Sequence, residues 1–234
     1  MSANQYEITI LNQSALDQQY LLFQTSPTPN EQPSSTVFLN VYQASPIVPK
    51  PTAQGEVSRA SFTITEQWYA INGTAPSPLN ANVTVNTSES EPVTLGAGAT
   101  KGTTLSLTTI NSDGEDPKFD DSKTMAAAPN GAFQIVADTT FRFPNGNNIF
   151  IGLGAPDPLD ASNILPTASI AALPGVTETI WPHNKWYIST GSFEQGEIID
   201  TQSLTTTPLE VDFEAGLPKQ TFTNNSDGTF TPVA

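Results

Sequence analysis

The densest group of side chains that could hold a metal ion is a run of acidic residues in the middle of the chain. Its members are Asp113, Glu115, Asp116, Asp120 and Asp121. Carboxylate oxygens are ligands that Ca²⁺ prefers, so calcium is the one cofactor that the sequence suggests. The spacing departs from the Asp-x-Asp-x-Asp-Gly pattern of an EF-hand loop, and Lys118 and Lys123 dilute the charge. A solvated acidic loop without a metal is the simpler interpretation, and the sequence predicts no other cofactor.

A second group of candidate binding residues is aromatic. Trp68, Tyr69, Trp181 and Trp186 stand beside segments rich in turn-forming residues. Aromatic faces next to Asn and Asp side chains can stack on sugar rings, so these four residues suggest a glycan-binding surface. The competing interpretation is that the rings fill the core or anchor loops.

Catalytic machinery has little support in the sequence. The chain has one histidine, His183, and no cysteine, so a Ser-His-Asp site would have to use His183. Pro182 and Asn184 flank it, which predicts an exposed loop. Glu66 and Asp212 are the best candidates for a glycosidase pair, because each alternates with apolar or aromatic neighbours. With 23 acidic residues such pairs arise easily by chance, so the sequence predicts that the protein is not an enzyme.

Composition excludes two classes of partner. The 234 residues include 23 acidic and 8 basic side chains, and the net charge is −15. Eight bases cannot form a wide phosphate-binding face, so we expect neither nucleic acid nor an anionic membrane as partner. No apolar run approaches the roughly 18 residues of a membrane-spanning helix. The first residues show no basic segment followed by an apolar one, which favours a cytoplasmic protein.

The elements that must position these residues are predicted to be β-strands. Tyr6–Leu11 and Phe62–Trp68 alternate between apolar and polar residues, as half-buried strands do. Tyr20–Gln24 and Ile149–Leu153 are apolar on both faces, which predicts central strands of a sheet. The range 164–173 reads as either a strand or an apolar plug carried by a loop.

The pattern as a whole predicts one all-β domain over residues 1–234. Its fold class is an antiparallel β-sandwich, jelly-roll-like, with about 12–14 short strands and little helix. Spacings of about 8–15 residues leave no room for βαβ crossovers. Residues 112–131 are expected to form a long acidic surface excursion with one helical turn at Ser122–Ala128.

Several short segments carry a resemblance to a known family. These segments are Tyr6–Ser14, Leu22–Gln24, Phe150–Gly154, the pair Asp212-Phe213 and Asp227–Phe230. They resemble segments of the rhizosphere-induced proteins. The resemblance implies an abundant cytoplasmic protein linked to quorum-regulated growth around plant roots. It supplies no catalytic residue that could be carried over to this chain.

Together these observations favour a non-catalytic β-sandwich protein with a structural or interaction role. Few lysines guard its predicted strands, so self-association is expected, and the partner is a second copy or another protein. A lectin-like glycan-binding module, with or without calcium, is the alternative hypothesis. A glycosidase is the third.

Overall fold

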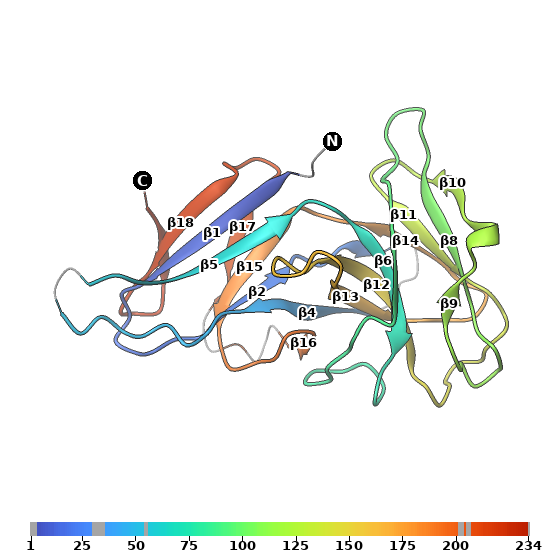
Figure 1. The fold of residues 1–234 in the computed structure, drawn as a ribbon, viewed down its shortest axis with the longest axis horizontal. Helices are drawn as coiled ribbons and strands as arrows, with labels where there is room; N and C mark the ends of the chain where they lie inside the picture. Colours follow the sequence, from blue (N-terminus) through green and yellow to red (C-terminus); the bar gives the residue numbers. More distant parts are fainter. Residues whose placement is uncertain (1–3, 30–35, 54–55, 201–203, 205–206, 234) are drawn as a thin grey trace.

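The protein is built from β-strands. The computed structural model describes residues 4–29, 36–53, 56–200, 204 and 207–233. This part of the chain holds 19 strands and a single three-residue 3₁₀ helix (Figure 1). The all-β prediction is confirmed. The strand number exceeds the expected one partly because β3, β9 and β16 have two residues each, too few to show a periodic pattern.

A long antiparallel sheet forms the centre of the molecule. In spatial order it contains β17 (Leu209–Asp212), β15 (Lys185–Thr190), β2 (Tyr20–Gln24), β4 (Val37–Ala44), β13 (Ile164–Ala171), β12 (Ile149–Pro156), β6 (Tyr69–Thr74) and β7 (Glu89–Pro92), with β16 (Ile198–Ile199) beside β4. Every residue of β2 and β12 is buried, which confirms the two predicted central strands. The range 164–173, left open by its sequence, contains strand β13.

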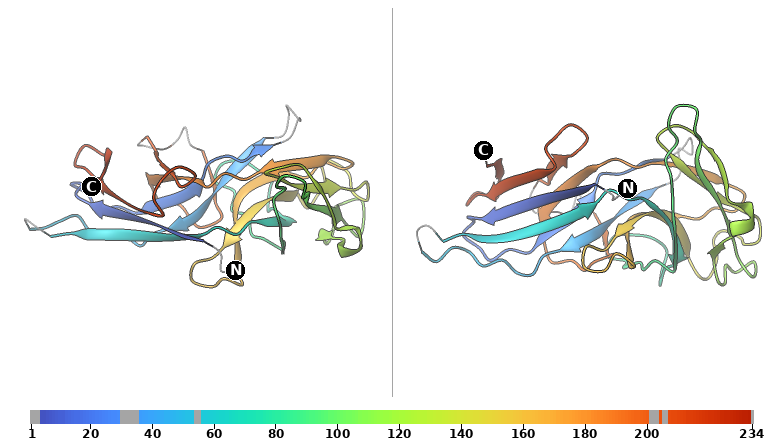
Figure 2. Two further views of the ribbon diagram at one scale, coloured as in Figure 1. Left: turned by 90° about the horizontal axis from the view of Figure 1, so that it is seen from above. Right: turned by 45° about the horizontal axis from the view of Figure 1, so that its top comes forward.

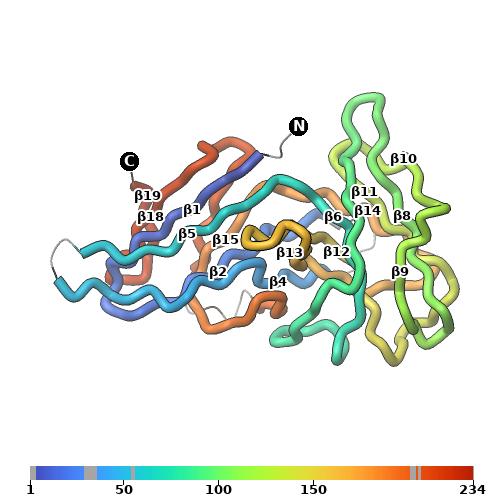
Figure 3. Tube along the Cα trace, in the orientation of Figure 1, coloured from blue at the N-terminus to red at the C-terminus, as the bar shows by residue number. Residues whose placement is uncertain are grey.

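Two smaller sheets flank this central sheet. The first has the order β19 (Phe230–Pro232), β18 (Lys219–Asn224), β1 (Gln5–Asn12) and β5 (Ser58–Thr65). The second has the order β10 (Met125–Ala128), β8 (Gly102–Thr108), β11 (Phe133–Ala137), β14 (Thr177–Trp181) and β3 (Thr28–Pro29), with β9 (Lys118–Phe119) beside β8. The β1–β18 and β8–β11 pairs are parallel, whereas the other pairs are antiparallel. The two small sheets lie toward opposite ends of the molecule (Figures 2 and 3).

Both small sheets pack on the same face of the central sheet. The first sheet contributes Ile8 and Ile10 to one hydrophobic cluster, and the second contributes Leu105 to another. Leu153 and Ala155 of β12 point to one face because they are two residues apart, yet they belong to these two different clusters. The opposite face is covered by loop residues within 75–88 and 191–204. The result is a sandwich-like arrangement of layers.

The acidic segment 112–131 forms part of the second small sheet. Strand β9, the 3₁₀ helix η1 (Asp121–Lys123) and β10 all lie within it. The predicted helical turn at Ser122–Ala128 is therefore wrong for Met125–Ala128, which pairs with β8. Pairing with a neighbouring strand overrides the weak helical preference of three alanines in a row. Within the described residues, no helix reaches the length and apolarity needed to cross a membrane.

Candidate functional site

The predicted calcium ligands have separate partners at the start of the acidic segment. The carboxylate of Asp113 forms an ion pair with the guanidinium of Arg142, 2.5 Å away. Glu115 accepts a hydrogen bond from Nδ2 of Asn111 at 2.7 Å. Asp116 has a φ of 51°, a left-handed backbone conformation within a turn. These three acidic residues serve the turn that joins β8 to β9.

The remaining two acidic residues belong to η1. Asp120 caps this helix by accepting the Ser122 N–H bond at 3.1 Å, and its other oxygen pairs with Lys123 at 3.0 Å. Hydrogen bonds from Ser122 and Lys123 lower the pKa of Asp120. Asp121 is the first residue of the helix. No group of three or more Asp, Glu or His side chains that could hold a metal ion occurs among the residues that the structure describes.

Two of the four predicted sugar-stacking aromatic residues lie in the core. Trp186 is fully buried, and its ring centroid is 5.1 Å from that of Tyr42. Its Nε1–H donates a hydrogen bond to Oδ1 of Asn184 at 3.1 Å. Trp68 is 9% exposed and packs in the cluster between the central sheet and the second small sheet. Neither ring presents a face to a sugar.

The other two aromatic residues lie on different sheets. Tyr69 begins β6 of the central sheet, and its hydroxyl accepts a hydrogen bond from Nε2 of Gln67 at 2.8 Å. Trp181 ends β14 of the second small sheet, and its Nε1–H donates to the carbonyl of Asn130 at 3.1 Å. The four predicted residues are thus split between core and surface and between two sheets.

The single histidine joins two of the sheets. Nε2 of His183 is 3.1 Å from the hydroxyl of Thr28 on β3, and Nδ1 is 3.5 Å from Oε1 of Glu214. The same Glu214 oxygen accepts the backbone N–H bond of Asn184, and its second oxygen is 3.8 Å from Nζ of Lys185. A hydroxyl, an imidazole and a carboxylate in sequence are groups of a nucleophilic site. Here the carboxylate is shared, and the contacts tie the edge strand β3 to the segment after β17.

The carboxylates considered for a glycosidase are engaged in local contacts. Glu66 accepts hydrogen bonds from the Tyr6 hydroxyl at 2.8 Å and from Nδ2 of Asn4 at 2.9 Å. Asp212 forms an ion pair with Lys185 at 2.9 Å, and this hydrogen-bonded contact lowers the pKa of Asp212. Both side chains therefore have clear structural roles.

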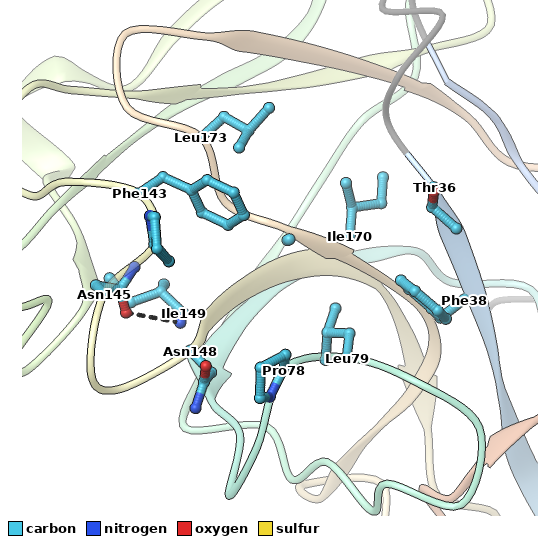
Figure 4. Close-up of a pocket in the computed structure, with 12 residues that line it drawn as sticks. Thr36, Phe38, Pro78, Leu79, Phe143, Asn145, Asn148, Ile149, Ile170 and Leu173 are labelled. Carbon is cyan, nitrogen blue, oxygen red and sulfur yellow. Dashed lines mark hydrogen bonds between the residues drawn. The ribbon is translucent and has the colours of Figure 1, made fainter.

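A cavity of about 470 Å³ opens at one end of three neighbouring strands, β4, β13 and β12 (Figure 4). Ile149 and Ile170 form its floor; they are 2% and 1% exposed and belong to the core between the central and second small sheets. Phe38, Phe143 and Leu173 rise around this floor, with Pro78 and Leu79 on the remaining side. The cavity is thus an opening onto the hydrophobic core.

Hydrogen bonds hold the wall that carries Phe143. Oδ1 of Asn145 accepts the Ile149 N–H bond at 3.3 Å, and its Nδ2 donates to the carbonyl of Arg142 at 3.1 Å. Nδ2 of Asn148 donates to the carbonyl of Ala75 at 3.3 Å. The first two bonds close the turn before β12, and the third fastens it to the loop after β6. The shape of the cavity is therefore built into the fold.

The polarity of the cavity limits what it can bind. Its polar side chains are Thr36, Asn145 and Asn148, and no described residue of the lining is charged. Cavities that hold small molecules measure about 300–1,000 Å³ and combine an apolar lining with a few polar groups. This cavity meets both conditions and suits an uncharged molecule. An ion would lose its hydration there without gaining a partner.

Sequence reasoning missed this cavity. Its residues come from four segments, 36–38, 78–79, 143–149 and 170–173, which only the sheet order brings together. The one local signal in the sequence is the strong turn directly after Phe143. In the structure this turn leaves the large apolar side chain of Phe143 54% exposed.

Comparison with known proteins places the chain in a family. No curated protein and no solved structure matches it. The model of the RhiA family matches residues 3–233, nearly the whole chain. The chain therefore belongs to the RhiA family, the rhizosphere-induced proteins that its opening and closing segments resemble.

Proposed function

We propose that this protein is a non-catalytic binding protein that holds a small, uncharged and largely apolar molecule in the cavity beside Phe143. The observation that carries the proposal is an apolar cavity that reaches down to Ile149 and Ile170, two residues of the hydrophobic core. A ligand seated there extends the core and removes apolar surface from water. Each Å² of apolar surface buried in this way is worth about 25 cal/mol.

The lining specifies the ligand class further. Apolar contacts from Phe38, Leu79 and Leu173 suit an aromatic ring or a short alkyl chain. The Thr36 hydroxyl can donate one hydrogen bond to a polar end of the ligand, and the Oδ1 atom of Asn148 can accept one. Esters, amides and alcohols of modest size fit this description, whereas carboxylates and sugars do not.

A fluorescence titration tests the proposal. N-phenyl-1-naphthylamine, a neutral apolar dye, is expected to bind one site, and its anionic relative 1-anilinonaphthalene-8-sulfonate is expected to bind more weakly. Ala171 lines the cavity, so Ala171→Phe should fill it and weaken dye binding at least tenfold. Ala126 is an exposed residue of β10, and Ala126→Phe makes the same chemical change away from the cavity. Equal affinity in the two variants, or no saturable binding, would contradict the proposal.

The engaged carboxylates and the scattered aromatic rings support a binding role over the glycosidase and lectin hypotheses. They do so because Glu66 and Asp212 are held by local contacts and the four aromatic residues form no common surface. We also propose a cytoplasmic location, which rests on the family resemblance. Fractionation of cells that produce the protein tests this location directly.

A further inference from the structure

A second hollow, of about 670 Å³, runs along the outer edge of β5. Strand β5 is the last strand of its four-stranded sheet, so one side of it pairs with β1 and the other side pairs with no strand among the described residues. Residues 58–63 form one wall of the hollow, and residues 43–49 and 157–159 form most of the other. We call this feature the β5 groove. It lies outside the cavity described above.

The ladder between β1 and β5 shows which backbone groups face the groove. The Glu66 N–H group donates to the carbonyl of Asn4, which extends the β1–β5 ladder by one pair. Hydrogen-bonded and non-hydrogen-bonded pairs alternate in antiparallel sheets, so the even-numbered residues of β5 bond to β1. The N–H and C=O groups of Arg59, Ser61 and Thr63 therefore point away from β1 into the groove.

An observed side-chain contact supports this assignment. Nε2 of Gln43, from the far wall, donates a hydrogen bond to the carbonyl of Thr63 at 2.9 Å. The edge of β5 thus already accepts a hydrogen bond from a group placed across the groove. The N–H and C=O groups of Arg59 and Ser61 continue the same row.

The groove walls provide apolar contacts and one unpaired charge. Ile47 is 70% exposed and Leu159 is 96% exposed, and both line the groove. The exposed Arg59 guanidinium forms no ion pair with any described residue. The Asp157 carboxylate, the other charge among the described lining residues, accepts hydrogen bonds from the Leu159 N–H and from Asn163. Arg59 is therefore available to a carboxylate brought by a partner.

The other free strand edges are blunted in ways that β5 is not. Strand β7 carries two glutamates and a proline, β17 carries two acidic residues, and β3 and β19 each contain a proline. Strand β10 has four residues and an irregular register. Strand β5 has eight residues, no proline and one charge. Proteins usually guard such an edge, because it is a template for another strand.

We propose that the β5 groove binds an extended acidic peptide segment of a partner protein, which adds a strand to the edge of β5. Backbone hydrogen bonds to Ser61 and its neighbours would give affinity, and a carboxylate on the peptide would pair with Arg59. Six residues of β5 span about 20 Å, so the peptide has about six ordered residues. A peptide would bring a single strand to the groove, whereas a second copy would have to bring its whole sheet against the far wall.

The test uses the full chain and a synthetic peptide. The probe is a fluorescent eight-residue peptide that alternates valine and threonine and carries one glutamate at its centre. Its control is the same peptide with every backbone amide N-methylated, which leaves no N–H group on either edge to form the ladder. Fluorescence anisotropy should report saturable binding of the first peptide and at least tenfold weaker binding of the second.

Two variants locate the binding site. Ser61→Pro removes an N–H group that faces the groove and leaves the β1 ladder intact, so we expect at least a tenfold loss of affinity. Arg59→Glu should weaken binding several-fold, whereas Lys101→Glu, the same charge change at another exposed residue, should not. Tight binding of the N-methylated peptide, or no binding of the unmodified one, would overturn the proposal. A dimer seen by sedimentation and abolished by Ser61→Pro would also overturn it, because the occupant would then be a second copy.

Discussion

The side-chain amide of Asn12 donates a hydrogen bond to the carbonyl oxygen of Val48 at a distance of 3.0 Å, although 36 residues separate them. Asn12 is fully buried at the end of β1. The same Nδ2 atom also lies 3.1 Å from the carbonyls of Leu16 and Pro49, and Oδ1 accepts bonds from the N–H and hydroxyl of Ser14. The buried amide of Asn12 therefore holds Val48 and Pro49, which belong to the far wall of the β5 groove, against the end of β1.

Replacing this amide should destabilise the protein. Asn12→Leu takes the donor from the Pro49 carbonyl and the acceptor from the buried Ser14 N–H, and each such group costs about 1–3 kcal/mol. We expect the free energy of unfolding, measured by urea titration, to fall by about 3 kcal/mol. Asn225→Ala removes a side-chain amide that bonds Thr229 in an exposed turn, and its effect should stay below about 1 kcal/mol. Equal losses in the two variants would show that Asn12 has no special role.

Gly152 should not tolerate a side chain. It lies in the middle of β12, and a Cβ atom there would be 1.9 Å from the carbonyl oxygen of Ala168 on β13. A backbone atom cannot move aside as a side chain can, so Gly152→Ala should cost about 3 kcal/mol. Gly146→Ala is the control, because nothing lies within 4 Å of its Cβ position. Thermal unfolding of both variants decides the matter, and a normal melting temperature for Gly152→Ala would refute the close approach.

The two tryptophans near the ends of β14 and β15 should differ sharply in their effect on stability. Trp186→Ala empties a fully buried site against Tyr42, and such truncations cost about 3–5 kcal/mol. Trp181→Ala removes a partly exposed ring with one hydrogen bond to Asn130, so about 1 kcal/mol is expected. Denaturant unfolding of both variants measures the difference. A mild Trp186→Ala variant that loses binding to a glycan array would instead favour the lectin hypothesis.

Stability should fall in acid because several carboxyl groups are stabilised by local contacts. Hydrogen bonds from Lys185 and from backbone N–H groups lower the pKa of Asp212 below its ordinary value of 3.8, and Ser162 does the same for Asp160. Such groups stabilise the fold fully above the unfolded-state pKa and lose this effect as the pH falls through the folded-state pKa. The melting temperature should therefore drop below about pH 4.

Asp212→Asn provides the matching variant for the acid experiment. It removes one titrating group with a lowered pKa, so the melting temperature should fall less steeply between pH 4 and pH 2 than in the unchanged protein. The pKa of Glu91 is shifted in the opposite direction, because burial and the nearby Asp121 and Glu89 raise it. A melting temperature that rises steadily as the pH falls to 2 would show that relief of the general negative charge outweighs these contacts.

The sequence predicted the strands whose two faces are both buried. Tyr20–Gln24 and Ile149–Leu153 are apolar at every position or nearly so, and this signal is local because it depends only on burial. The range 164–173 gave no such answer, because Pro166, Thr167 and Ser169 interrupt it while remaining buried in β13. Periodicity in the sequence indicates which way a side chain faces, but it does not show which strand lies beside it.

The candidate sites depended on that missing information. The cavity gathers four distant segments, and His183 meets Thr28 across 155 residues. Trp186 and Trp181 share the local signal of an aromatic residue near a turn, yet one is buried and the other lies at the surface. The parallel pairing of β8 with β11 likewise follows from a long connection that no local pattern encodes.

Strand β12 connects the two hollows of the molecule. Its first residue, Ile149, lies in the floor of the cavity, and Asp157, which follows its last residue, lines the β5 groove. Eight buried residues span about 26 Å between them, paired on both sides by β13 and β6. Because one strand joins the two sites, binding at one site can be coupled to binding at the other. If one ligand changes the affinity of the second ligand by some factor, the second must change the affinity of the first by the same factor. The rate of hydrogen exchange at the β12 amides would then change when a ligand binds in the cavity or in the β5 groove.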